Sequence, residues 1–140
     1  ISLDLGVPDD AARIVAVANR HSGAPERLWL CHRECEIVAA WREIATSVRL
    51  DDSTRLERIR DGPDRRAAHL AAAGIDAINL HESDWTRGLA SLFHRFGLKC
   101  LGWDAQHPRQ IDRLLKIGID GLYSDHVDRM VARLQTVDPA

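Results

Sequence analysis

Cysteine is scarce in this chain, and its spacing excludes the residue's commonest structural uses. The 140 residues contain three cysteines, Cys31, Cys35 and Cys100, with no C-x-x-C pair. An odd number without such pairing argues against a disulfide framework, so we expect a reducing compartment and a cytoplasmic location. The segment "CHREC" also contains His32, but a tetrahedral zinc site needs four ligands and no second cluster of ligand spacing follows. We therefore interpret Cys31 and Cys35 as buried thiols.

Long apolar runs and an excess of one charge are absent as well. No uncharged apolar run approaches the ~20 residues that cross a bilayer, and no secretory signal is visible. With 19 Lys and Arg against 21 Asp and Glu, the net charge is -2, so no nucleic-acid partner is expected. Five arginines alternate with acidic residues, and we interpret them as a solvated helix face: Arg55, Arg58, Arg60, Arg65 and Arg66. Because the chain opens at Ile1 in a strand-like segment, we expect its own beginning, and any export signal there, to be missing.

What the chain has is a repeated alternation of strand and helix. Apolar residues recur at helical spacing in five stretches, beginning with Ala11, Ile14, Val15 and Ala18, and a less regular helix fits Asp64 to Ala73. A short hydrophobic run precedes each stretch: "ISLDL", "RLWLC", "SVRL", "IDAINL", "LKCLGW" and "IDGLYS". Glycines at 74, 97 and 118 follow helical stretches, where a left-handed residue can end a helix. Six strand–helix units predict an α/β fold with a parallel sheet.

Six units leave two architectures open. A closed (β/α)₈ barrel needs eight strands, whereas an open doubly wound sheet can stop at five or six. The dinucleotide fingerprint G-x-G-x-x-G and the phosphate loop G-x-x-x-x-G-K-[ST] are both missing, which removes the best-marked functions of open sheets. The chain is therefore either an open sheet of unmarked function or the later three-quarters of a barrel.

Polar residues stand at the predicted carboxyl ends of all six strands, which is the functional edge of both architectures. Asp4 differs from the rest because it interrupts "ISLDLG" inside the strand, with Leu3 and Leu5 on the opposite face. A buried carboxylate needs a partner, either a metal ion or an internal ion pair. Trp103 ends another strand, where an indole either packs in the core or forms the wall of a ligand pocket.

The last third of the chain resembles the glycerophosphodiester phosphodiesterase domain family. That family ends with a strand carrying W-T-V-N, a helix, and a segment of the form G-V-D-G-I-x-T-D-x-P. Here the corresponding stretch is "GWDAQHPRQIDRLLKIGIDGLYSDHVDRM", which matches at Trp103, at Gly118 to Gly121 and at Ser124 with Asp125. The opening "ISLDLG" resembles the family's x-N-I-E-I-K strand, so the resemblance spans almost the whole chain.

The resemblance implies a TIM (β/α)₈-type barrel, incomplete in this chain, whose first two strands are missing. It implies a divalent metal ion, Mg²⁺ or Ca²⁺, and hydrolysis of glycerophosphodiesters to glycerol 3-phosphate and an alcohol. Asp4 takes the place of a metal-binding glutamate, and Trp103 that of a tryptophan lining the substrate pocket. The other strand-tip candidates for substrate binding are His32, Arg33 and His81.

The chain also departs from the family pattern. The acid–base histidines of its H-R-G and H-D segments and the carboxylates of the E-x-D segment on its second strand have no counterpart, because the chain starts at the strand that corresponds to the third. Gly6 stands where a lysine faces the phosphate. We therefore predict that residues 1–140 form a partial barrel domain that contains no catalytic residue and is inactive alone. A non-catalytic α/β binding or regulatory module is the alternative. The two differ in assembly, since a partial barrel has open sheet edges through which it can self-associate.

Overall fold

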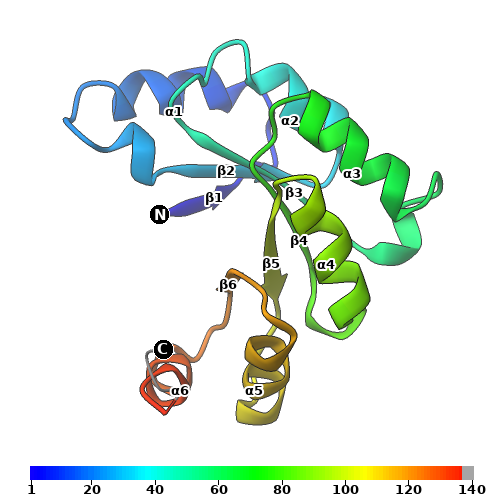
Figure 1. Ribbon diagram of the computed structural model, residues 1–140. Coiled ribbons are helices and arrows are strands. Elements are labelled where there is room, and N and C mark those ends of the chain that lie inside the picture. Colours follow the sequence, from blue (N-terminus) through cyan, green and yellow to red (C-terminus); the bar gives the residue numbers. More distant parts are fainter. Residues whose placement is uncertain (137–140) are drawn as a thin grey trace.

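Six parallel strands form one sheet in residues 1–136, the part of the chain that the computed structural model describes. They follow chain order, and each is hydrogen-bonded to the next. Their bounds are Ser2–Asp4 (β1), Trp29–His32 (β2), Arg49–Thr54 (β3), Ala77–His81 (β4), Lys99–Trp103 (β5) and Gly121–Leu122 (β6). Figure 1 shows that the row of strands curls, with the helices on its outer side. The predicted partial barrel is confirmed, and within the described residues β1 and β6 each pair on one side only.

A helix follows every strand, as the apolar spacing predicted. The α-helices are Asp10–Ala18 (α1), Cys35–Trp41 (α2), Pro63–Ala72 (α3), Arg87–Arg95 (α4), Pro108–Ile117 (α5) and Val127–Leu134 (α6). All three predicted helix-ending glycines, Gly74, Gly97 and Gly118, have positive φ, of 70°, 76° and 90°, a left-handed conformation that other residues rarely adopt. No helix within residues 1–136 combines the length and the apolar character that a membrane crossing requires.

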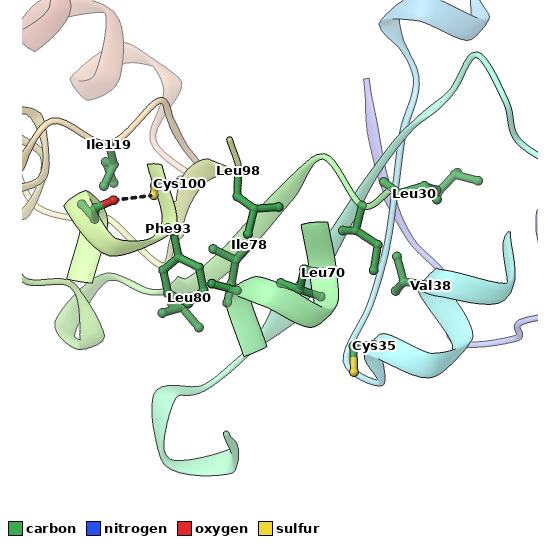
Figure 2. Close-up of a cluster of buried hydrophobic side chains, with 14 of the residues drawn as sticks. Leu30, Cys35, Val38, Leu70, Ile78, Leu80, Phe93, Leu98, Cys100 and Ile119 are labelled. Atoms are coloured by element: carbon green, nitrogen blue, oxygen red, sulfur yellow. Dashed lines mark hydrogen bonds between the residues drawn. The ribbon is translucent and has the colours of Figure 1, made fainter. Parts of the chain in front are cut away.

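The core lies between the convex face of the sheet and the helices. Strand residues of alternate parity, among them Leu30, Leu50 and Ile78, are fully buried there. Figure 2 shows Leu70 of α3 and Phe93 of α4 packed over this layer. The remaining strand positions face the concave side, so the same alternation that builds the core also fixes which side chains line the barrel interior.

The predicted solvated helix face at residues 55–66 is wrong in its first half, which is not helical, and also for Arg66, whose side chain is only 15% exposed. A single 3₁₀ turn, Leu56–Arg58 (η2), follows β3 at the carboxyl edge of the sheet, and α3 begins only at Pro63. Gly62, with φ of 86°, separates the turn from the helix. The charge alternation is therefore shared between a loop at the sheet edge, which carries Arg55 and Arg58, and a helix, which carries Arg66.

Candidate functional site at the carboxyl edge of the sheet

A cavity of about 430 Å³ opens on the concave side, at the carboxyl ends of the strands. Every strand, or the segment directly after it, contributes to its lining. The chemically distinctive lining residues are Asp4, Arg33, Arg55, Arg58, Trp103 and Tyr123. Parallel strands end at one edge, so residues far apart in sequence meet here. The site is thus built by the topology of the sheet.

Asp4 lies at the end of β1 and is exposed to the cavity. Its strand neighbour Leu3 packs on the opposite side, against the core. Asp4 is the one carboxylate among the cavity-lining side chains of the described chain. Its oxygens suit Mg²⁺ or Ca²⁺, but such ions take about six or more oxygen ligands. The described residues therefore fit a metal ion only as one part of a site, and the metal role of Asp4 remains a prediction.

A second carboxyl, that of Asp51 in β3, lies on the same face of the sheet. Cys31 of β2 separates the two in register, since it aligns with Asp4 on one side and with Asp51 on the other. Asp51 is fully buried, and neither of its oxygens has a hydrogen-bond partner within the described chain. Burial, and then the charges of Asp52 and Asp4, raise the pKa of Asp51 well above its usual range. Burial thus penalises the charged form of this carboxyl in the barrel interior more than it would be penalised in water.

Trp103 forms one wall of the cavity, and its neighbours fix it there. The ring of His81 lies nearly perpendicular to the indole, at an interplanar angle of 82°, with the ring centroids 4.6 Å apart. The guanidinium of Arg55 lies 5.8 Å from the centroid of the indole, within the range of a cation–π contact. The indole Nε1–H also donates to the carbonyl of Thr54 at 3.4 Å. An indole held on three sides offers a rigid apolar surface to a ligand.

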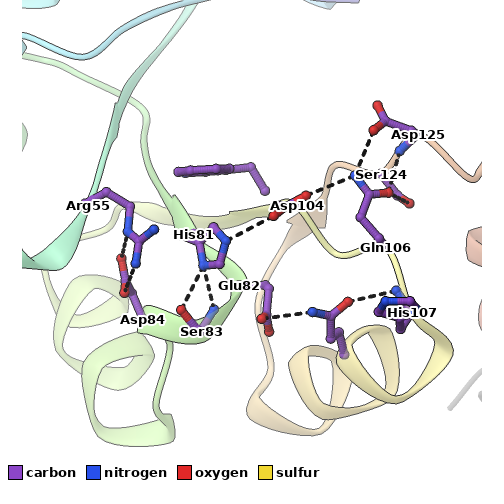
Figure 3. A network of polar contacts seen from close by, with 12 residues as sticks. Arg55, His81, Glu82, Ser83, Asp84, Asp104, Gln106, His107, Ser124 and Asp125 are labelled. Carbon is purple, nitrogen blue, oxygen red and sulfur yellow. Dashed lines mark hydrogen bonds and ion pairs between the residues drawn. The ribbon is translucent and has the colours of Figure 1, made fainter.

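A polar network behind this wall holds its members in place (Figure 3). Asp84 accepts two hydrogen bonds from the Arg55 guanidinium, at 3.0 and 3.3 Å. His81 contacts Asp104 through Nε2 at 3.1 Å. Hydrogen bonds from Gln106 and His81 lower the pKa of Asp104, which is held at a φ of 63°. The network therefore orients Arg55 and Trp103 before any ligand arrives.

Positive charge dominates the mouth of the cavity. Among the described lining residues, three arginines, Arg33, Arg55 and Arg58, stand against one carboxylate, that of Asp4. Carboxylates outside the lining lie near two of these arginines: Glu34 at 3.8 Å from Arg33 and Asp84 at 3.0 Å from Arg55. The side chain of Arg33 is 70% exposed, so most of its guanidinium donors face solvent. Guanidinium groups match phosphate geometry through paired donors. The arrangement suits a small anion with an apolar or hydroxylated part against Trp103.

The sequence matches a protein-family model over residues 6–129, and that model describes the glycerophosphoryl diester phosphodiesterase family. The chain belongs to this family. A comparison with curated protein sequences gives no match. The family resemblance drawn from Trp103 and the terminal G-I-D-G segment is confirmed.

Solved structures agree with the family and show how much of its fold this chain contains. A putative glycerophosphoryl diester phosphodiesterase from Agrobacterium tumefaciens superimposes with a TM-score of 0.79 at 21% identity, over 96% of this chain and 56% of that one. One from Silicibacter pomeroyi gives 0.76 at 22% identity, over 91% and 44%. An Oleispira antarctica phosphodiesterase, in complex with its product sn-glycerol-3-phosphate, gives 0.76 at 14% identity, over 92% and 50%. The chain spans about half the length of these structures.

The structure brings together some of the predicted phosphodiesterase site residues and not others. Asp4, Arg33 and Trp103 line the cavity, and His81 reaches it through its contact with Trp103. His32 does not reach it. Its ring packs edge-on against Trp41 of α2 with centroids 6.0 Å apart, and its Nδ1 accepts a hydrogen bond from the backbone of Glu34. Because Cys31 faces the cavity, the next residue along the strand faces the helices, so this placement gives the predicted substrate-binding role of His32 no support.

Sequence reasoning missed two cavity arginines. Arg55 and Arg58 were assigned to a solvated helix face, but the turn after β3 places both in the lining. The signal was the position of "STRLERIRDGP" directly after a strand, with the helix-breaking "GP" pair behind it. A strand end followed by a Gly-Pro stop predicts a loop, and loops at this edge carry function.

Proposed function

We propose that this chain forms the carboxyl-terminal part of a glycerophosphodiester phosphodiesterase barrel and supplies the substrate-binding side of its site. The observation that carries the proposal is the single cavity shared by Asp4, Trp103 and the three arginines. Membership of the family supports the substrate class, and the lining supports it independently, since cations surround the opening and an indole forms a wall. The ligand is a phosphodiester with a glycerol part, or its glycerol 3-phosphate product.

Each lining residue has a defined task in this proposal. Arg33 and Arg58 donate hydrogen bonds to the phosphate oxygens from the open side of the cavity. Arg55 is held by Asp84 and adds a fixed positive charge beside the indole. Trp103 packs against the carbon atoms of the glycerol part and keeps water from that side. The arginines thereby provide the positive charge that Gly6 cannot supply in place of the family's lysine.

Asp4 is the proposed metal ligand, and Mg²⁺ or Ca²⁺ is the proposed ion. Such an ion stabilises the charge that grows on the phosphate oxygens during hydrolysis. No H-R-G or H-D segment occurs in residues 1–140, so the chain does not supply the acid–base histidines. Its one E-x-D string, Glu82–Asp84, follows β4 as a 3₁₀ turn, and both of its carboxylates are paired with arginines, so we propose that the remaining oxygen ligands also come from outside these residues. We therefore propose that the isolated chain binds the product and does not catalyse hydrolysis.

Hydrolysis of glycerophosphocholine, measured in the presence of Mg²⁺ or Ca²⁺, tests this proposal. A full-length family member assayed alongside sets the scale. We expect release of choline at the uncatalysed rate with the 140-residue chain, together with measurable binding of glycerol 3-phosphate. Turnover near that of the full-length enzyme would refute the proposal that the catalytic groups lie outside this chain. The lack of any glycerol 3-phosphate binding would refute its substrate-binding role.

The open ends of the sheet favour the partial barrel over a self-contained binding module. Within the described chain, β1 pairs with β2 alone and β6 with β5 alone. Unpaired parallel edges promote strand pairing between copies. We propose that the isolated chain self-associates through these edges, and size-exclusion chromatography at several concentrations should show a dimer or a larger species. A monomer at all concentrations would instead favour the binding module.

A further inference from the structure

Three metal-ligating side chains meet on the outer side of the sheet, away from the cavity. Cys35 is the first residue of α2, Glu36 is the second, and His69 lies on α3. One ligand atom from each side chain lies within 4.8 Å of the other two. In a tetrahedral zinc site, bonds of about 2.0–2.3 Å place ligand atoms roughly 3.5 Å apart. Small side-chain rotations would therefore bring these atoms to zinc-ligand spacing.

A buried carboxylate without a hydrogen bond, that of Asp52, is connected to this cluster through Arg66. Asp52 of β3 is fully buried, and neither of its oxygens has a hydrogen-bond partner within the described chain. Its nearest cation is the guanidinium of Arg66, with Nε 3.6 Å from an oxygen of Asp52. The same guanidinium contacts the sulfur of Cys35 through Nη1. Arg66 thus stands between a thiol and a carboxylate, and its own buried Nε is left without a hydrogen bond.

A second cluster in the chain shows what a fully satisfied arrangement looks like. His94, Cys100 and Asp120 also gather within 4.8 Å. There Asp120 accepts hydrogen bonds from His94 at 2.8 Å, from Lys99 at 3.1 Å and from the backbone N–H of Cys100 at 2.8 Å. The thiol of Cys100 donates to the carbonyl of Ala90. The carboxylate and the thiol of this cluster both have hydrogen-bond partners, so it serves as structural support, whereas the carboxylate of Asp52 beside the Cys35 cluster has none within the described chain.

We propose that Cys35, Glu36 and His69 bind one zinc-class cation, with the Asp52 carboxylate facing it as the fourth ligand or as the group that orients Cys35 and Glu36. Sulfur, imidazole and carboxylate ligands together select zinc or a similar borderline metal over Mg²⁺ or Ca²⁺. In the metal-free chain the guanidinium of Arg66 occupies the position of the cation. Binding displaces this guanidinium and releases the thiol proton of Cys35 to water, so the sulfur binds as thiolate. The site lies on the helix side of the sheet and does not depend on the proposed phosphodiesterase function.

Titration with Co²⁺ provides the test, because a thiolate ligand gives a sulfur-to-cobalt charge-transfer band. We expect one Co²⁺ per chain with this band, and its displacement by Zn²⁺. Cys35→Ser should abolish the band, and His69→Gln should weaken binding at least about 10-fold, since each removes a ligand. Asp52→Asn should weaken it by about 10–100-fold, the usual cost of losing a group that supports the ligands. Arg66→Met should tighten binding, because the competing guanidinium is gone.

The other cysteines and an exposed histidine are the matched controls. Cys31→Ser, Cys100→Ser and His94→Gln should keep the band and the affinity of the unmodified chain. Loss of the band in Cys31→Ser would place the ion on the concave face, and loss in Cys100→Ser would place it at the second cluster; either result overturns the proposal. So does an unmodified chain with no thiolate band. Because Cys35 is buried, its replacement can disturb folding, so circular dichroism of each variant checks that the fold is kept. His69 is exposed, and His69→Gln therefore removes a ligand without changing the core.

Discussion

Asp4 at the end of β1 and Trp103 at the end of β5 line the same cavity, although three strands separate them in the sheet. Only a curled sheet brings these two strand ends to one opening, and Figure 1 shows that curl. The relationship gives the chain a defined interior without a closed barrel. It also determines where a ligand would bind, between a carboxylate on one side and an indole on the other.

Removal of an exposed cavity arginine should weaken anion binding selectively. Arg58→Ala is expected to lower the affinity for glycerol 3-phosphate by about 10-fold, because a hydrogen bond to a charged group contributes about 1.5–3 kcal/mol. Isothermal titration calorimetry measures the change. Arg60→Ala removes the same charge from the same loop, outside the cavity lining, and should leave the affinity within a factor of two. Equal losses in the two variants would show that general charge, and not the cavity, attracts the anion.

The buried carboxyl of Asp51 should make the chain less stable as the pH rises. Its folded-state pKa is raised, first by burial, so the folded protein retains a proton that the unfolded chain releases. Stability is therefore lost as the pH increases from the unfolded value toward the folded one. Asp51→Asn removes this penalty and should increase the free energy of unfolding at pH 7, with a smaller gain near pH 4, as measured by urea denaturation.

The control for this experiment is an exposed carboxylate. Asp9→Asn also removes one negative charge but lies on the surface, so it should change stability by less than about 0.5 kcal/mol at either pH. If Asp51→Asn proves less stable than the unmodified chain at pH 7, Asp51 has a partner that stabilises its charged form, and the account of the barrel interior is wrong.

Packing of β5 against α5 and the loop after it should make Gly102 sensitive to a single methyl group. A Cβ atom there would lie 2.9 Å from Cδ1 of Ile119 and 3.3 Å from Cδ1 of Leu114, both in the core. Gly102→Ala should therefore destabilise the chain by about 1–2 kcal/mol, within the usual cost of overpacking. Gly88→Ala in α4 meets no atom within 4 Å and should stabilise by about 0.5 kcal/mol. Thermal unfolding of the two variants compares them directly, and a neutral Gly102→Ala would mean that the Ile119 side chain is free to move.

Much of the fold could be read from the sequence because its physical causes are local. Helical spacing of apolar residues and glycines such as Gly118 determine where helices run and end. The direction of Asp4 was readable for the same reason, since a carboxylate flanked by leucines must face away from their side of the strand. The terminal resemblance around Trp103 then selected a barrel over an open sheet, and family membership bears it out.

The parts that could not be read depend on contacts between distant segments. Arg55 and Arg58 share their charge pattern with the helix that follows, and only the chain path after β3 shows that they face the cavity. The sequence places His32 at a strand end, but only the pairing of β2 with its neighbours shows that its side chain faces the helices and not the cavity. The approach of His69 to Cys35 depends on how α2 and α3 pack, which no spacing within either segment reveals.

The most direct test of the cavity as the substrate-binding side is the indole N–H resonance of each tryptophan during titration with glycerol 3-phosphate. Trp103 lines the cavity, whereas Trp29, Trp41 and Trp85 lie outside its lining and serve as internal controls. The account predicts a saturable shift of the Trp103 signal, with a midpoint about 10-fold higher in Arg58→Ala, while the other three signals stay in place. A Trp103 signal that does not move at saturating ligand, or a shift confined to the other tryptophans, would contradict it.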